Sequence, residues 1–313
     1  LNKCDTSSLV FFCIVYFLTS IHIMIKYSIM HFPIVPLPIP EPLQHIPQPP
    51  KQLSIRGTFP DFNKYKFLCV VGSRKYTPYG EDACRTLLAG LKGYPIVIVS
   101  GLAHGIDRIS HEAALENALP TIAFPGSGLD DKVLYPKAQY QLAHDILKSG
   151  GALISEFKSD FSATLWSFVQ RNRLMAGLAH ATLVIEAENK SGTRVTARLA
   201  TEYNRDVYAV PGSIFSKKSE GTNELIKLGA TPITCAQDIL EALGFTVTET
   251  KPVDLFSQCS PEEESVINLL ASSKPRGELI REMNMPTHKA NILLSQMELK
   301  SLIKEVGGEI RRV

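Results

Sequence analysis

The fold is decided by the stretch Lys66-Phe67-Leu68-Cys69-Val70-Val71-Gly72-Ser73-Arg74-Lys75-Tyr76-Thr77. Its five consecutive apolar residues, 67–71, are typical of a strand buried in a parallel sheet. The glycine that follows lets the backbone approach an anion, and a helix predicted at 81–91 would point unpaired N–H groups at it. Arg74 adds a charge that can clamp a phosphate, and Ser73 adds a hydroxyl. The corner is therefore predicted to be an anion site or an ordinary strand-to-helix turn.

The chain from residue 65 to residue 234 repeats this pattern of apolar strands and helices. Because strands and helices alternate at short spacing, the class is α/β, with an extended Rossmann-like parallel sheet covered by helices on both faces. Ligands of such sheets bind beyond the carboxyl ends of the strands. The strands are predicted at 67–71, 96–100, 121–124, 152–155, 181–185, 206–210 and 231–234.

Small and charged residues gather at those carboxyl ends. Several glycine turns at one edge of a sheet predict a shared ligand site better than any one turn, and the alternative is a set of tight turns without a ligand. The candidate residues are Gly72, Ser73, Arg74 and Lys75 after the first strand, Gly101, His104 and Gly105 after the second, Gly126, Ser127 and Gly128 after the third, and Ser191, Gly192 and Thr193 at a later helix start.

Other residues fit two interpretations each. Arg171 and Arg173 fit either a charged helix face or phosphate contacts, and Lys137 is equally ambiguous. The aromatic residues Phe157, Phe161 and Trp166 fit either core packing or base stacking. His104 has no nucleophile or carboxylate paired with it by sequence, so a turn or ligand contact is favoured over a catalytic base.

Missing motifs, cysteine spacing and net charge argue against several other kinds of binding site. The dinucleotide pattern G-x-G-x-x-G and the P-loop are both missing, so neither a nicotinamide cofactor nor ATP is indicated. The 6 cysteines have no metal-site or redox spacing, which predicts no metal and suits a reducing, cytoplasmic compartment. The formal net charge is +2, so nucleic-acid binding would need a local basic patch.

The two ends of the chain differ from its centre. Residues 1–30 include an apolar run at 9–25, which fits a spanning helix, a signal peptide or a segment absent from the mature protein. Residues 31–52 are proline-rich and are predicted to be extended, with a short edge strand at 53–57. A linker at 246–259 leads to a predicted winged helix at 260–313.

The winged helix carries equal numbers of basic and acidic residues, eight of each. A neutral domain binds phosphates poorly, so a protein-interaction or auxiliary role is favoured there over duplex binding.

The motifs together resemble the DprA/Smf family of DNA-processing proteins, over roughly residues 46–245. The resemblance implies that residues 53–245 form a Rossmann-like domain that binds single-stranded DNA, dimerises and helps load the RecA recombinase in natural transformation. It gives Gly72, Ser73 and Arg74 the family's DNA-binding motif and Lys137 its basic residue after Tyr-Pro. The matching stretches are 71–77, 100–107, 126–130 with Tyr135-Pro136, 155–156, 171–173, 191–200, 210–213 and 221–223.

Two departures from the family stand out. His104 occupies a position where many relatives have arginine, and residues 1–50 do not resemble the small helical domain that many members carry. The resulting hypothesis is a non-enzymatic protein of DNA recombination without cofactor or metal. One alternative is a related Rossmann-like enzyme that cleaves the base–sugar bond of nucleoside monophosphates. Another is a membrane-tethered DNA binder that uses residues 9–25.

Overall fold

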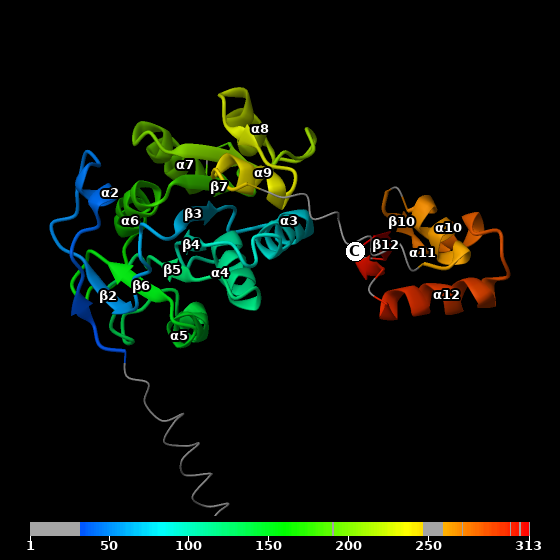
Figure 1. Cartoon of the computed structure of the whole chain (residues 1–313), viewed down its shortest axis with the longest axis horizontal. Coiled ribbons are helices and arrows are strands. Elements are labelled where there is room, and N and C mark those ends of the chain that lie inside the picture. Colours follow the sequence, from blue (N-terminus) through cyan, green and yellow to red (C-terminus); the bar gives the residue numbers. More distant parts are fainter. Residues whose placement is uncertain are drawn as a thin grey trace, which may run out of the picture. The chain divides into compact units, whose positions relative to one another are not determined.

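The computed structural model describes residues 32–189, 191–246, 259–270, 272–300, 302–306 and 308–312. The described residues form two compact units, divided between residues 246 and 247 (Figure 1). The apolar run at 9–25 and most of the predicted linker lie outside the described residues. In the described part of the chain, no helix combines the length and the apolar character needed to cross a bilayer.

The first unit is built on a nine-stranded sheet with the order β1-β2-β6-β5-β4-β3-β7-β8-β9. The strands from β3 to β9 pair in parallel, whereas β1 and β2 add antiparallel pairs beyond β6. This confirms the predicted α/β class and its largely parallel sheet. The strands are β1 Val35–Pro36, β2 Ser54–Gly57, β3 Lys66–Val71, β4 Ile96–Ser100, β5 Thr121–Ala123, β6 Ala152–Ser155, β7 Ala181–Val184, β8 Asp206–Ala209 and β9 Thr231–Pro232.

Strand β3 lies at the centre of the sheet, between β4 and β7. Leu68 pairs in parallel register with Ile98 on one side and with Ala181 on the other. All residues from Phe67 to Val71 are buried, which explains why this strand reads as an unbroken apolar run. Later strands extend the sheet in opposite directions from β3 and its neighbour β7, so the order reverses here and creates the crevice where such sheets bind ligands.

Helices cover both faces of this sheet, with α3, α4 and α5 on one face and α6 and α7 on the other (Figure 1). The reversal of strand order explains this, because right-handed crossovers that run in opposite directions place their helices on opposite faces. The helices are α3 Pro78–Ala89, α4 Ile106–Glu116, α5 Tyr140–Lys148, α6 Leu165–Leu178, α7 Gly192–Glu202, α8 Glu220–Lys227 and α9 Ala236–Ala242.

The proline-rich lead-in is less extended than predicted. Residues Glu41–Gln44 form the short helix α2, whose Leu43 is fully buried against α6 beside Gly177. A proline in the first turn of a helix loses no backbone hydrogen bond, so proline content alone does not exclude a helix there. The predicted edge strand also forms, as β2, but β1 pairs outside it and makes it the second strand.

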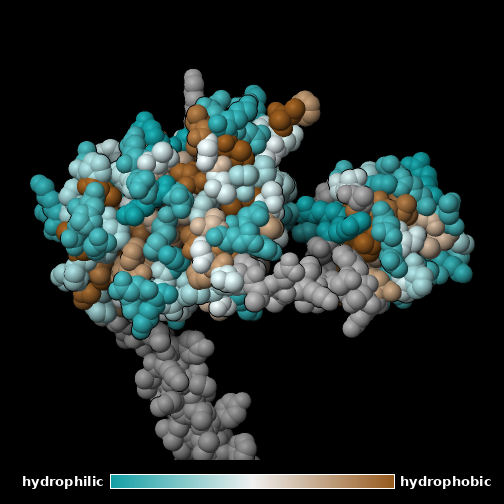
Figure 2. Space-filling model, turned by 45° about the horizontal axis from the view of Figure 1, so that its top comes forward, coloured by the Kyte–Doolittle hydropathy of each residue, from teal (hydrophilic) through white to brown (hydrophobic). Residues whose placement is uncertain are grey.

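The second unit has its own core and the order of elements predicted for a winged helix. A three-stranded sheet with the order β10-β12-β11 packs with the helices around Val266, Leu279, Leu294 and Ile310. Figure 2 shows mainly hydrophilic surface with separate hydrophobic patches on the described parts of both units. The elements are α10 Pro261–Leu269, β10 Lys274–Pro275, α11 Arg276–Glu282, α12 Thr287–Leu299, β11 Ile303–Val306 and β12 Glu309–Arg312.

Candidate nucleic-acid interface

The turn after β3 is held by contacts from the starts of two helices. The Thr193 hydroxyl at the start of α7 donates a hydrogen bond to the Gly72 carbonyl at 3.0 Å. The backbone N–H of Ile106 at the start of α4 donates to the Ser73 carbonyl at 3.2 Å. Glycine turns that are far apart in sequence therefore meet at the end of β3. This agrees with the expectation that the turns at the carboxyl ends of parallel strands lie together.

Gly105 permits this close approach of two loops. Its φ angle is +82°, and a Cβ atom at this position would collide with the Ser73 carbonyl and the Arg74 backbone. Only glycine adopts this conformation without strain and leaves room for the turn. Gly105 thus shapes the site, and it is not among the residues that line the pocket.

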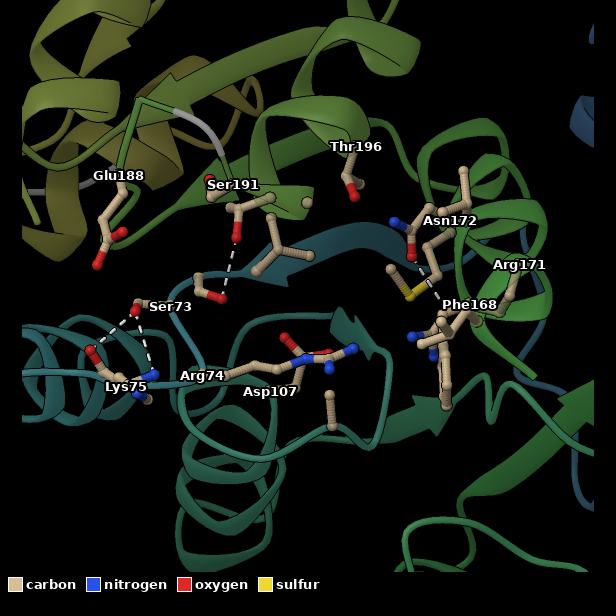
Figure 3. Close-up of a pocket in the computed structure, with 18 of the residues that line it drawn as sticks. Ser73, Arg74, Lys75, Asp107, Phe168, Arg171, Asn172, Glu188, Ser191 and Thr196 are labelled. Atoms are coloured by element: carbon tan, nitrogen blue, oxygen red, sulfur yellow. Dashed lines mark hydrogen bonds between the residues drawn. The ribbon is translucent and has the colours of Figure 1, made fainter. Parts of the chain in front are cut away.

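A pocket of about 600 Å³ opens beside this turn (Figure 3). Its wall combines four basic side chains, Arg74, Lys75, Arg171 and Lys218, with the carboxyl groups of Asp107 and Glu188. The structure thus gathers half of the predicted site residues around one cavity and gives it an excess of positive charge. Those lining residues are Gly72, Ser73, Arg74, Lys75, Arg171, Ser191, Gly192 and Thr193.

The starts of α3 and α7 differ in whether side chains of the protein already pair with their N–H groups. At α3, the N-cap residue Thr77 accepts from the Gly80 N–H at 3.2 Å, and the buried Glu186 carboxylate fills the remaining space. Of the two alternatives predicted for this corner, the start of α3 fits the ordinary turn, because a carboxylate of the protein already lies where an anion would bind. At α7, the Ser191 hydroxyl has no hydrogen-bond partner among the described residues and does not cap the helix.

The open start of α7 is the better anion site. Unpaired N–H groups in the first turn of a helix attract negative charge, and here they face the pocket that Ser191, Gly192 and Thr193 line. Arg74 and Lys218 line the same cavity. A phosphate placed there would meet backbone donors, a guanidinium and an ammonium together.

Lys218 is a pocket residue that the sequence analysis missed. Its ammonium lies 3.3 Å from the Ser73 hydroxyl and forms an ion pair with Glu188, which holds the pKa of that carboxyl below its usual range. The usable signal was the turn Pro211-Gly212-Ser213 after β8, which lies at the same edge of the sheet. The lysine itself follows five residues later in a surface loop, where no local pattern marks it.

The opposite wall of the pocket is apolar and comes from α6. Leu165, Phe168 and Val169 line it, and Leu165 and Val169 are exposed. The Arg74 guanidinium lies 5.4 Å from the centre of the Phe168 ring, a cation–π distance (Figure 3). The Tyr135 ring lies on Phe168 as well, at 5.6 Å between centroids. Charge and aromatic surface therefore meet across the cavity.

Arg171 lines the pocket from a buried position. It is 3% exposed, and its guanidinium donates to the carbonyls of Gly101 and Phe124 and to the Asn172 side chain. Burial lowers the pKa of Arg171 to about 10, although the nearby Asp107 opposes the change, so the side chain stays charged at neutral pH.

The interpretation of Arg171 and Arg173 as an exposed charged helix face is wrong for both residues. Carbonyl groups at the strand ends draw Arg171 inward, and Arg173 is buried in an ion pair with Glu156. Neither guanidinium projects into solvent as a surface phosphate contact would.

Burial also raises the pKa of the Asp107 carboxyl, against the opposing effects of Arg171 and of backbone hydrogen bonds.

The remaining predicted residues lie outside the pocket lining. Gly101 gives space to the Arg171 and Asp107 side chains, and Gly126 gives space to the Phe168 ring. His104 is exposed in the loop before α4, and Lys137 is exposed at the start of the short 3-10 helix Lys137–Gln139. The full set outside the lining is Gly101, His104, Gly105, Gly126, Ser127, Gly128, Lys137 and Arg173. Within the described residues, no group of three or more His, Cys, Asp or Glu side chains could hold a metal ion.

Comparison with known proteins places this arrangement in a family. The sequence profile of the family "DNA recombination-mediator protein A" matches residues 37–244. Protein Smf of Escherichia coli is 36% identical over 271 residues, which are 84% of this chain and 72% of that protein. DNA processing protein DprA of Streptococcus pneumoniae is 39% identical over 206 residues, 66% of this chain and 71% of that protein.

Solved structures agree with these sequence matches. DNA processing protein A from Streptococcus pneumoniae superposes with a TM-score of 0.62 at 35% identity and covers 72% of this chain and 79% of its own. DNA processing protein A from Helicobacter pylori, solved to examine its single-stranded DNA binding mode, also has a TM-score of 0.62, at 32% identity, and covers 68% of this chain and 96% of its own. The chain therefore belongs to the DNA recombination-mediator protein A family.

Proposed function

We propose that this protein binds single-stranded DNA in the pocket beside the β3 turn and acts, inside the cell, in DNA recombination and natural transformation. The observation that carries the proposal is the pairing of two unlike walls in one cavity. Arg74, Lys75, Lys218 and the start of α7 form a phosphate-binding wall, and Leu165, Phe168 and Val169 form an apolar one. A nucleic-acid strand has the same two sides, charged phosphates and flat bases.

The apolar wall favours a single strand over a duplex. In a duplex the base faces are stacked and inaccessible, whereas a single strand can lay a base against an aromatic ring. Phe168 is partly exposed, and the Arg74 guanidinium lies 5.4 Å from its ring centre, so a base that stacks there would lie close to a positive charge. The relative from Helicobacter pylori that was solved for its single-stranded DNA binding mode supports single-stranded DNA as the ligand.

Two finer parts of the proposal rest on family membership. We infer that the bound strand stays accessible, so that the RecA recombinase can be loaded onto it, and that the protein acts as a homodimer. The first part predicts that the parent chain, and not Arg74→Ala, speeds the assembly of recombinase filaments on coated single strands. The second predicts twice the chain mass by light scattering.

The test of DNA binding is fluorescence anisotropy with labelled single-stranded and duplex oligonucleotides. The parent chain should bind the single strand more tightly. Arg74→Ala should lose about 1–3 kcal/mol of binding free energy, the size of a charge-assisted contact. Lys289→Ala, which removes an exposed lysine of α12 in the second unit, is the matched control and should bind like the parent. Equal binding by Arg74→Ala and the parent would refute the pocket as the DNA site.

The enzymatic alternative makes a different prediction for the same pocket. A nucleotide-cleaving enzyme needs a carboxyl group that can reach the sugar. Here Asp107 is buried with backbone hydrogen bonds, and Glu188 is paired with Lys218. Both arrangements favour binding over catalysis. Incubation with nucleoside 5′-monophosphates, followed by chromatography of free bases, should show no product, and base release that is lost in Asp107→Asn would favour the enzyme.

A further inference from the structure

Three large apolar side chains are exposed within five residues at the start of α6. Leu165 is 89% exposed, Trp166 is 57% exposed and Val169 is 55% exposed. Leu165 and Val169 line the pocket, whereas Trp166 is not among the lining residues. Successive residues of a helix are about 100° apart around its axis, so Trp166 continues the apolar surface away from the cavity.

Trp166 belongs to a cluster of three aromatic rings. Phe157 and Phe161 stack on each other with centroids 4.6 Å apart. Trp166 meets them edge-on, with centroids 5.6 Å from Phe157 at an interplanar angle of 84° and 6.0 Å from Phe161 at 65°. The two phenylalanines thus support the indole ring from one side. More than half of the tryptophan nevertheless remains in contact with solvent.

The loop that carries the two phenylalanines is anchored by its backbone. The Gly128 N–H donates to the Phe161 carbonyl at 2.8 Å, and the Asp130 N–H donates to the Ser159 carbonyl at 3.0 Å. Gly128 packs so closely on this loop that a Cβ atom there would collide with the backbone of Lys158 and Ser159. The cluster is therefore built on fixed backbone, and a ring that is already ordered loses little entropy when a ligand stacks on it.

We propose that Trp166 is a second base-stacking site, which holds a nucleotide of the strand after it leaves the pocket. The inference rests on the proposed function and extends it by naming where the strand goes. Three observations carry it: the exposed indole, its supporting rings, and its continuity with the apolar pocket wall. Stacking on an aromatic ring accepts any base, so this site adds affinity without sequence preference.

Charge near the cluster is mixed. Lys158 is exposed beside Phe157, and Asp160 is exposed beside Phe161. The two opposite charges cancel at a distance, so the site supplies stacking, and the phosphate contacts remain in the pocket. Lowering the salt concentration should therefore strengthen pocket binding more than it strengthens the contribution of Trp166.

Trp166 is the single tryptophan of the chain, so fluorescence excited selectively at tryptophan reports this site. The parent chain is titrated with oligo-dT of about 12 nucleotides, a length within the site sizes of single OB folds that bind single strands. Anisotropy of a dye on the DNA measures total binding, and tryptophan emission measures stacking. We expect quenching of the emission with the same midpoint as the rise in anisotropy. A dinucleotide, too short to fill both sites, should give less quenching at equal occupancy.

Matched variants test the affinity. Trp166→Ala should weaken binding at least about fivefold, the lower end of the range for the loss of one stacked base. Trp166→Phe retains an aromatic face and should bind within about threefold of the parent. Leu299→Ala removes an apolar side chain of α12 in the second unit that is 87% exposed, and it should change nothing. Circular dichroism of each variant verifies the fold.

The outcomes separate this proposal from the proposed function. DNA binding with unchanged tryptophan emission, or with unchanged affinity in Trp166→Ala, overturns the stacking site and leaves the pocket intact as the DNA site. The exposed apolar side chains Leu165, Trp166 and Val169 would then be assigned to contact with a protein partner. Absence of any anisotropy change in the parent chain overturns the proposed function and the stacking site together.

Discussion

The Glu186 carboxylate accepts two hydrogen bonds from Thr77, one from the backbone N–H at 3.0 Å and one from the hydroxyl at 2.5 Å. The two residues lie 109 positions apart in sequence. Glu186 follows β7 and is 1% exposed, so a buried negative charge sits at the positive end of α3. The contact fixes the end of the turn that carries Ser73 and Arg74, and it leaves the start of α7 as the open anion site.

Removing the charge of Glu186 should destabilise the first unit. We expect Glu186→Gln to lower the free energy of unfolding by about 1.5–3 kcal/mol, because a hydrogen bond to a charged group and a favourable dipole contact are weakened. Urea unfolding followed by Trp166 fluorescence measures this change in the unit that contains the contact. Thr77→Ser keeps the hydroxyl and is the control.

Thr77→Val removes the hydroxyl and should also destabilise the unit. Since Glu186 and Thr77 share one contact, the effects of Glu186→Gln and Thr77→Val should not add in the double variant. Strict additivity would show that the two residues stabilise the unit independently.

Two helical glycines should respond in opposite ways to alanine. A Cβ atom on Gly80 in α3 would collide with the Glu186 carboxylate, whereas a Cβ atom on Gly277 in α11 would meet no atom within 4 Å. We expect Gly277→Ala to raise stability by about 0.4–1 kcal/mol through the unfolded chain, and Gly80→Ala to lower it. Thermal unfolding by circular dichroism measures both, with Trp166 fluorescence as the probe for Gly80→Ala. A stabilising Gly80→Ala would show that Glu186 moves without cost.

The dependence of DNA affinity on salt should reveal which cations contact phosphates. The logarithm of the binding constant should fall linearly with the logarithm of salt concentration, with a slope of about −0.7 per phosphate neutralised. Arg74→Ala and Lys218→Ala should each reduce the magnitude of the slope by about that amount. Lys289→Ala, in the electrically balanced second unit, should keep the parent slope. Anisotropy titrations at several salt concentrations measure the slope for each variant. A smaller slope in Lys289→Ala alone would place the DNA on the second unit. Lys137→Ala tests the exposed lysine that the family resemblance singled out.

Acid should destabilise the first unit through His111. Its ring is fully buried, Nδ1 lies 2.7 Å from the Thr121 hydroxyl, and Nε2 has no partner among the described residues. Burial lowers the pKa of His111 from 6.5 to about 3. Below pH 6.5 the His111 ring is therefore protonated in the unfolded chain but stays neutral in the folded chain. The free energy of unfolding should fall by up to about 1.4 kcal/mol per pH unit, until pH approaches 3.

A variant isolates this contribution from the carboxyl groups that also titrate in acid. Asparagine can place an amide N–H near the position of Nδ1, so His111→Asn should keep the bond to Thr121 and lose the titration. We expect lower stability at pH 7 because the smaller side chain leaves a cavity, and a shallower loss of stability between pH 6.5 and 4. Urea unfolding at several pH values measures the two slopes. Parallel slopes in parent and variant would assign the acid effect to other groups.

Sequence patterns were enough to predict the α/β class of the fold and the sheet edge that carries the candidate site. Apolar runs such as Phe67–Val71, separated by amphipathic stretches, indicate buried parallel strands and covering helices, because each pattern reflects the periodicity of its own element. The rule that ligands bind at the carboxyl ends of parallel strands then pointed to the turns after 71, 100, 124 and 185. These inferences needed only local patterns and the topology that they imply.

Which groups face the cavity became clear from the three-dimensional arrangement of the chain. Glu186 closes the start of α3, Arg171 turns inward to the carbonyls of Gly101 and Phe124, and Lys218 reaches Ser73 from 145 residues away. The physical reason is that strand order, which sequence spacing does not specify, brings β7 beside β3 and places the loop after β8 near the same crevice. Whether a charged side chain is buried or exposed depends on the hydrogen-bond partners that this order assembles around it, and no local pattern encodes them.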